Sequence, residues 1–311
     1  MAANAPFVTL QEAGPQTTVQ DLGRSGQLRY GIPPSGPMDR VAFIVANRLV
    51  GNPDSAAALE CTLAGPRFEV AAVGAIAVTG AAMPVTVNGH EAPTWMTIPV
   101  RPGDVVRVGV VRAGVRGYLA FAGGVDVPVV LGSRSTYIRG RLGGLEGRAL
   151  RKGDTLRLFP TAPPVVRATT PPFGLEDEPV LRVVLGPQAH RFTPEGVDAL
   201  LGHAYEMLPQ SDRMGARLRG PAIAHEAGHD IISDGIALGS LQVPGDGQPI
   251  ALLVDRQSTG GYTKVATICS FDIGRLGQVR PGQRVRFTAI SVAEAHTFLD
   301  EAEAALARIL V

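Results

Sequence analysis

Residues 241–268, LQVPGDGQPIALLVDRQSTGGYTKVATI, show most clearly how this chain folds. Two short runs of aliphatic and β-branched residues, Ile250–Val254 and Lys264–Ile268, are separated by a polar turn that ends in Gly260 and Gly261. Short runs of this kind, bounded by glycine or proline, are typical of β-strands. The stretch therefore predicts a β-rich fold with short strands and many turns.

The same character extends through the rest of the chain. Seven further runs are short, rich in β-branched residues and bounded by glycine or proline: Phe68–Val70, Ala75–Thr79, Val105–Val111, Tyr118–Phe121, Thr155–Phe159, Leu181–Leu185 and Val285–Ala289. The 311 residues include 38 glycines and 25 prolines, well above the usual combined share of about 12%. This composition argues against a helical bundle, a coiled coil or collagen.

A few helices are expected to pack on the strands. Three segments carry helix-capping signals: Pro37–Val50 before Gly51, the segment after Thr193-Pro194, and the last segment after Ser291-x-x-Glu294. In the last segment an apolar stripe recurs at helical spacing: Phe298, Leu299, Ala302, Leu306 and Ile309. Proline at the first helical position, glycine after the last turn and a capping box predict three helices.

A proline-rich segment divides the chain almost evenly. Six prolines lie between Pro160 and Pro179, and proline favours an extended linker. The two halves share short motifs in the same order, for example Ser35-x-x-Met38 and Ser211-x-x-Met214. We therefore predict a first β-barrel-like unit over 1–160, a linker over 161–179 and a second β-barrel-like unit over 180–311 that carries the site.

Charge and cysteine content exclude several classes of function. Lys and Arg number 29 against 28 Asp and Glu, a formal net charge of +1, so no nucleic-acid partner is expected. Two cysteines, Cys61 and Cys269, are too few for a disulfide framework and are expected to be small buried side chains. Residues 1–15 lack a signal-peptide pattern, and no apolar run approaches the ~18 residues of a membrane span. We expect a cytoplasmic protein with no membrane partner.

The candidate site lies in turns of the second half. Arginine beside aspartate suits the recognition of a carboxylate, carbamate or amide, and the corresponding first-half turn, 112–116, lacks this polar set. We assign catalytic roles to Asp212, Arg213, Asp255 and Arg256. Nine residues are assigned to substrate binding: Ser211, Met214, Gln242, Gln248, Gln257, Thr259, Gly261, Tyr262 and Lys264. The alternative is a surface turn held by salt bridges, which would carry no function.

Two other patterns are considered as sites. Four arginines, Arg134, Arg139, Arg141 and Arg148, lie in a glycine-rich basic loop that could close over an anion or dock a partner, although it lacks a P-loop lysine motif. His225-Glu226-x-x-His229 matches the zincin pattern, which binds zinc only on a helix. Because Gly228 interrupts the motif and no third ligand follows, we expect a loop with two solvated histidines and no metal site.

Several motifs together resemble a known family. The residues that carry the likeness are Gln20-Asp21-x-Gly23-Arg24, Gly31-Ile32-Pro33-x-Ser35-Gly36-x-Met38-Asp39, Ala46-Asn47-x-Leu49-Val50-Gly51-Asn52, Ser211-Asp212-Arg213-Met214-Gly215, Leu241-Gln242-Val243-Pro244-x-x-Gly247-Gln248-Pro249 and Asp255-Arg256-Gln257-x-Thr259-Gly260-Gly261-Tyr262. They resemble the KipA-type, or carboxyltransferase subdomain A/B, proteins, which are also described as allophanate-hydrolase-subunit-2-like. The C subunits of bacterial 5-oxoprolinases belong to this family.

The resemblance implies two cyclophilin-like β-barrel units in tandem and obligate pairing with a KipI-type subunit. It implies work with a LamB/YcsF-type subunit as an ATP-dependent 5-oxoprolinase, in which the complex binds ATP and opens the 5-oxoproline lactam to glutamate. One alternative is the carboxyltransferase part of a biotin-dependent urea carboxylase. The other is a regulatory partner of a kinase inhibitor.

In the enzymatic alternatives a small amide or lactam would bind at the second-half turns. Arg213 and Arg256 would hold a carboxylate or carbonyl oxygen. Asp212 and Asp255 would orient the arginines or accept protons. Hydrogen bonds to the substrate would come from Gln242, Gln257 and Tyr262.

Overall fold

The computed structural model describes residues 6–162, 165–172 and 174–309. The chain forms two compact units. The first unit comprises Met1–Ser25, Ser35–Leu175 and Arg308–Val311, and the second comprises Gly26–Pro34 and Glu176–Ala307. Pro163 and Pro164 of the expected linker lie outside the described residues.

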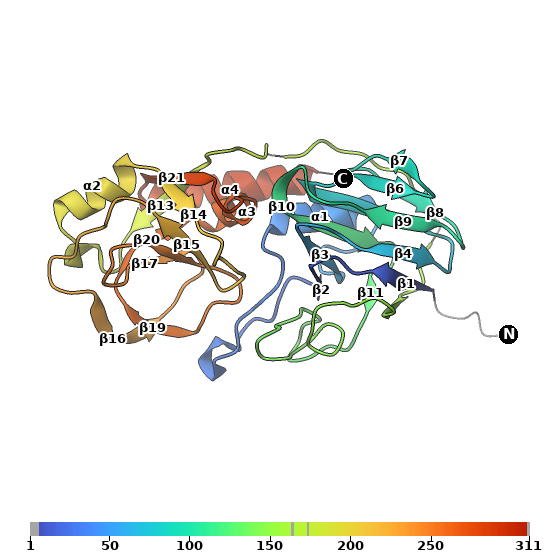
Figure 1. The fold of residues 1–311 in the computed structure, drawn as a ribbon, viewed down its shortest axis with the longest axis horizontal. Helices are drawn as coiled ribbons and strands as arrows, with labels where there is room; N and C mark the ends of the chain where they lie inside the picture. The colour runs from blue at the N-terminus through green and yellow to red at the C-terminus, as the bar shows by residue number, and fades with distance from the viewer. Residues whose placement is uncertain (1–5, 163–164, 173, 310–311) are drawn as a thin grey trace. The chain divides into compact units, whose positions relative to one another are not determined.

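The first unit contains two β-sheets (Figure 1). The seven-stranded sheet has the order β11 (Val125–Asp126), β12 (Thr155–Leu158), β1 (Phe7–Glu12), β4 (Arg67–Val70), β9 (Val105–Val108), β6 (Val85–Val87) and β7 (His90–Ala92). The five-stranded sheet has the order β2 (Gln16–Gln20), β3 (Ala58–Thr62), β10 (Ala113–Phe121), β5 (Gly74–Ala82) and β8 (Ile98–Val100). Neighbouring strands in both sheets pair antiparallel.

Alternation of side chains along the strands builds the core of this unit. In β4 and β9 every second residue is buried, as expected of strands with one face on a core. Phe68 of β4 meets Phe121 of β10 edge to face, with ring centroids 5.3 Å apart. Aliphatic side chains such as Val8, Leu10 and Leu119 complete the cluster, so the core joins strands of both sheets.

Helix α1 (Arg40–Leu49) begins three residues later than predicted. The Asp39 carboxylate accepts a hydrogen bond from the Ala42 amide at 3.0 Å and so caps the helix. The amides of Met38 and Asp39 instead donate to Glu60 and to the Tyr118 hydroxyl, at 2.8 and 2.7 Å. Pro37 therefore lies before the helix and is not its first residue. Gly51, with φ of 77°, follows the helix as predicted.

The second unit is a closed seven-stranded barrel with a short arm (Figure 1). The barrel order is β13 (Val180–Leu185), β20 (Lys264–Ile268), β17 (Ser240–Gln242), β18 (Ile250–Leu252), β15 (Gly215–Arg219), β14 (Tyr205–Met207) and β21 (Arg284–Ala289). Parallel pairing of β13 with β21 closes the barrel, which removes its free edges. The arm is an antiparallel pair, β16 (Asp230–Gly235) and β19 (Thr259–Tyr262).

Helical segments of the second unit follow the predicted caps. The Thr193 hydroxyl accepts from Gly196 at 3.0 Å and starts α2 (Pro194–Gly202), while Ser291 and Glu294 form the capping box of α4 (Val292–Arg308). Leu306 of the predicted stripe is buried. The other helical segments are η1 (Leu28–Tyr30), η2 (Ala189–Arg191), η3 (Ser270–Asp272) and α3 (Ile273–Gly277).

The prediction of a mainly β protein with a few helices is confirmed. All nine predicted strands are present, although β9 ends at Val108 and β18 at Leu252, before the predicted Val111 and Val254. Beyond β18 the chain still follows β15, because the Leu253 amide donates to the Met214 carbonyl at 2.8 Å. In the described part of the chain, no helix is long and apolar enough to span a membrane.

Candidate functional site

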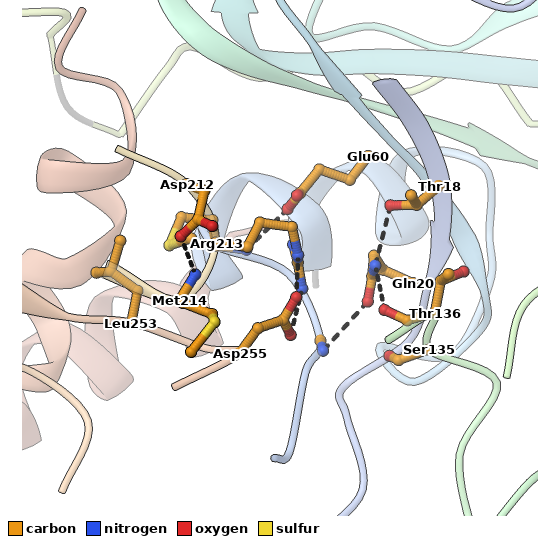
Figure 2. A network of polar contacts seen from close by, with 12 residues as sticks. Thr18, Gln20, Glu60, Ser135, Thr136, Asp212, Arg213, Met214, Leu253 and Asp255 are labelled. Carbon is orange, nitrogen blue, oxygen red and sulfur yellow. Dashed lines mark hydrogen bonds and ion pairs between the residues drawn. The ribbon is translucent and has the colours of Figure 1, made fainter. Parts of the chain in front are cut away.

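A buried ion pair joins two of the predicted catalytic residues. Arg213 Nε and Nη2 donate to Asp255 Oδ2 and Oδ1 at 2.9 and 3.3 Å, and both side chains are 7% exposed (Figure 2). Gly215 of β15 pairs with Leu252 of β18, which brings together the loop before β15, with Arg213, and the loop after β18, with Asp255. The Asp255 amide donates to the Arg213 carbonyl at 2.9 Å. A buried pair of this geometry fixes the direction of the guanidinium.

The loop before β15 is shaped by its own polar side chains. Asp212 Oδ1 accepts from the amides of Met214 and Gly215 at 2.8 and 3.2 Å, which is the geometry of an Asx turn (Figure 2). The Ser211 hydroxyl accepts from the Arg217 amide at 3.0 Å. Asp212 and Ser211 therefore hold the backbone that carries Arg213.

Arg256 is a second buried cation of this loop cluster. Its side chain donates to main-chain carbonyls, from Nε to Ile236 at 3.1 Å and from Nη1 to Leu253 at 3.3 Å. The residue is 6% exposed, and burial lowers the pKa of its guanidinium. Carbonyl dipoles thus hold Arg256, whereas a carboxylate holds Arg213.

A further polar cluster lies beside the arm. Gln242 of β17 and Lys264 of β20 are partners in register, and each is 2% exposed. Gln242 Oε1 accepts from Gln257 Nε2 at 3.4 Å, and Lys264 Nζ lies 3.4 Å from Asp234 Oδ2. A Cβ on Gly260 would lie 2.6 Å from Gln242 Nε2, so glycine allows the arm to approach this amide.

The other predicted binding residues take different places. Gln248 holds Gly220, accepting from its amide at 2.9 Å and donating to its carbonyl at 3.2 Å, at the end of β15 away from Arg213. Thr259, Gly261 and Tyr262 belong to arm strand β19, where Tyr262 is 41% exposed. Their roles in binding stay predictions.

Two residues of the cluster beside the arm were missed by the sequence reasoning. Gln188 Oε1 accepts from the Lys264 amide at 3.1 Å, and its Nε2 lies 3.5 Å from Asp234 Oδ2. Gln188 and Asp234 are separated from Lys264 by 76 and 30 positions, so no local motif links them. A signal that could have found Asp234 is the β-branched pair Ile231-Ile232 before Gly235, in the segment that forms β16 although no strand was predicted there.

The basic loop of the first unit is pinned by Asp21. Its carboxylate accepts from the Ser133 and Ser135 hydroxyls at 2.5 and 2.7 Å and from the amides of Arg134 and Gly23 at 2.6 and 2.9 Å. Burial alone raises the pKa of Asp21, but these hydrogen bonds outweigh it and leave the pKa below its ordinary value. The carboxylate is therefore bound as an anion.

Nearby contacts hold the same loop. Gln20 donates to the Thr18 hydroxyl and the Thr136 carbonyl at 2.9 and 3.2 Å, and accepts from the Gly36 amide at 3.2 Å (Figure 2). A Cβ on Gly143, where φ is 66°, would lie 2.1 Å from the Ser135 carbonyl oxygen. These contacts disfavour a loop that swings over a ligand.

The four loop arginines have unequal surroundings. Arg148 donates to both oxygens of Asp154 at 2.7 and 2.9 Å, which raises its pKa, and it also binds Glu146. Arg134 donates to the Val127 carbonyl at 3.0 Å. Arg139 and Arg141 are exposed.

The two motif histidines lie outside any helix. His225 Nε2 lies 3.1 Å from both the Val243 carbonyl and the Thr263 hydroxyl, and its ring packs on Phe192 at 4.6 Å. The loop is as predicted, but His225 is partly buried and not fully solvated; burial is the main reason that its pKa is lowered. Across the described ranges, no group of three His, Cys, Asp or Glu side chains is arranged to hold a metal.

Both cysteines are buried and free, as predicted. Burial raises the pKa of Cys61 to about 12, so its thiolate is disfavoured at neutral pH. Neither thiol belongs to the polar clusters described above.

Comparisons with known proteins agree with this architecture. The family model for the carboxyltransferase domain, subdomain A and B, matches residues 30–289. The C subunit of the 5-oxoprolinase from Escherichia coli K12 is 38% identical over 91% of each chain. The urea amidolyase of Lachancea kluyveri is 34% identical over 94% of this chain but 17% of its own. The crystal structure of the K. lactis urea amidolyase has a TM-score of 0.92 at 31% identity, covering 98% of this chain and 20% of that one.

Proposed function

This chain belongs to the carboxyltransferase domain, subdomain A and B, family, and on this premise we propose that it is a subunit of an ATP-dependent 5-oxoprolinase. The complex would break the lactam C–N bond of 5-oxoproline, add water to the carbonyl carbon and release glutamate. The observation that carries this proposal is the 38% identity to the C subunit of a 5-oxoprolinase over 91% of both chains.

The second unit supplies the groups for this substrate. A lactam carbonyl gains negative charge on its oxygen during ring opening, and fixed cations stabilise that charge. Arg213, oriented by Asp255, and the buried Arg256 are the cations proposed for this role. Because both guanidinium groups are already held in place, they need little reorganisation when the charge develops.

Other subunits would complete the reaction. We propose a KipI-type and a LamB/YcsF-type subunit as partners, with ATP bound outside this chain. The basic loop is a poor phosphate site, since Arg148 is engaged by Asp154 and Glu146. ATP would supply the driving force for opening the stable lactam.

The test is glutamate formation from 5-oxoproline by the three co-expressed subunits with and without ATP. Arg256→Met should lower kcat at least 100-fold, a loss of the size seen when one oxyanion donor is removed. Arg219→Gln is the matched control, because this barrel arginine forms an exposed pair with Glu206. Full turnover by Arg256→Met in an assembled complex would contradict the assigned site.

A second candidate is the carboxyltransferase step of a biotin-dependent urea carboxylase. The TM-score of 0.92 to the K. lactis urea amidolyase favours it. Biotin would come on another chain and would supply the carboxyl group. Transfer of labelled carboxyl from carboxybiotin to urea, with no glutamate formed from 5-oxoproline, would select this candidate; an assembled complex inactive in both assays would favour a regulatory partner.

A further inference from the structure

Lys264 is a buried cation without adequate compensation. Its side chain is 2% exposed, and within the described ranges its Nζ has no hydrogen-bond partner. The nearest opposite charge is Asp234 Oδ2, at 3.4 Å. An ammonium group withdrawn from water is costly unless its donors are satisfied. The unsatisfied state therefore indicates a group retained for a ligand.

The carboxylate of Asp234 indicates which chemical group that ligand carries. Lys264 Nζ and Gln188 Nε2 converge on the same oxygen of Asp234, at 3.4 and 3.5 Å. Gln188 Oε1 accepts from the Lys264 main-chain amide at 3.1 Å, and this contact directs Gln188 Nε2 toward Asp234. Both distances exceed the 2.7–2.9 Å of a good charge-assisted hydrogen bond.

Asp234 is suited to give way to a ligand. It lies on arm strand β16, and its side chain is 55% exposed, whereas that of Lys264 is almost fully covered. The hydrogen bond from the Gly235 amide and then the charge of Lys264 lower the pKa of Asp234, so it is an anion at neutral pH. A free carboxylate, without a backbone tether, could approach both donors more closely.

We propose that Lys264 and Gln188 form a seat for the carboxylate of the substrate, and that Asp234 occupies this seat as a placeholder until substrate displaces it. This inference rests on the proposed function and sharpens it, because it selects an anionic substrate such as 5-oxoproline over neutral urea. Lys264 and Gln188 are positioning residues here, since they hold a group remote from the bond that breaks.

The test observes Lys264 directly. Lys152 and Lys264 are the only lysines of the sequence, so ¹³Cε-lysine labelling of this chain in the assembled complex gives two lysine side-chain signals. Without ATP, 5-oxoproline should shift the Lys264 signal and leave that of the exposed Lys152 unchanged. The neutral analogue 2-pyrrolidinone should leave both unchanged at the same concentration. Equal shifts from both probes, or no Lys264 shift at saturating 5-oxoproline, would overturn the proposal.

Variants separate the role of Lys264, which binds the substrate carboxylate, from that of Asp234, which occupies the seat before substrate binds. Lys264→Met should weaken 5-oxoproline binding at least tenfold, whereas Asp234→Ala should tighten it several-fold by removing the competing anion. Asp230→Ala is the control, because it removes an exposed carboxylate of the same strand. Weaker binding by Asp234→Ala would show that Asp234 is a ligand and overturn its placeholder role. Since binding is measured without turnover, a seat that binds 5-oxoproline in a complex with no lactamase activity would refute the proposed function alone.

Discussion

Asp21 in the first unit and Lys264 in the second are both charged and buried, but they differ in what surrounds the charge. The Asp21 carboxylate accepts four hydrogen bonds at 2.5–2.9 Å. The Lys264 ammonium faces a single carboxylate oxygen at 3.4 Å. A satisfied buried charge holds a fold together, whereas an unsatisfied one weakens it and needs another reason to be kept.

The Asp21 carboxylate and the Lys264 ammonium therefore have different roles. Asp21 joins the end of β2 to residues 133–135, more than 100 positions away in the sequence. Lys264 instead converges with Gln188 on an exposed side chain of the arm. We therefore expect substitutions at Asp21 to reduce stability, and substitutions at Lys264 to weaken binding without reducing stability.

Asp21→Ala should have the largest effect on stability. It leaves two serine hydroxyls and two amides without their acceptor, so the free energy of unfolding should fall by roughly 3–5 kcal/mol. Denaturant unfolding measures the change. Asp126→Asn is the control, because Asp126 faces Arg157 at 3.8 Å on the surface and should change stability by less than about 1 kcal/mol. Equal losses for both variants would break the comparison.

Lys264→Met should change stability in the opposite direction. Methionine fills a similar volume and removes a buried charge that lacks a hydrogen bond, so the free energy of unfolding should rise by about 1–2 kcal/mol. The same denaturant experiment measures it, with Lys152→Met as the exposed control. A clear loss of stability in Lys264→Met would mean that the ammonium supports the fold.

The smallest effect is the dependence of stability on pH in the first unit. The pKa of Asp21 is lower folded than unfolded, so its contribution is fully present above the unfolded value of about 3.9 and is lost as pH falls through the folded value. The stability difference between the wild type and Asp21→Asn should therefore shrink as pH falls below about 4. A difference that stayed constant down to pH 2 would contradict a bound carboxylate.

Local features of the fold followed closely from the sequence. The caps at Thr193 and Ser291 and the glycine after α1 were found where predicted, because these signals act over three or four residues. The start of α1 was misplaced because Asp39, which has extended backbone angles of φ −108° and ψ 90°, caps the helix through its carboxylate. A carboxylate cap thus overrode the proline signal at Pro37.

The candidate site was predicted in part. Aspartate was expected to orient arginine, and the structure pairs Arg213 with Asp255, which lie 42 positions apart in two different turns. Asp234 and Gln188 were missed because neither stands in a motif with Lys264. Ser211 and Gln248 form hydrogen bonds that hold the loops around β15, and their roles in binding stay predictions.

The sequence by itself determined the β-rich class, the positions of nine strands and the caps at Thr193 and Ser291, because apolar runs, turn residues and caps are short-range properties. Only the tertiary structure decided which buried charges are satisfied. Closure of the barrel, the four bonds to Asp21 and the convergence of Lys264 and Gln188 on Asp234 all join segments far apart in the chain. Such pairings depend on strand register and on how the chain returns to itself, and these are properties of the whole fold.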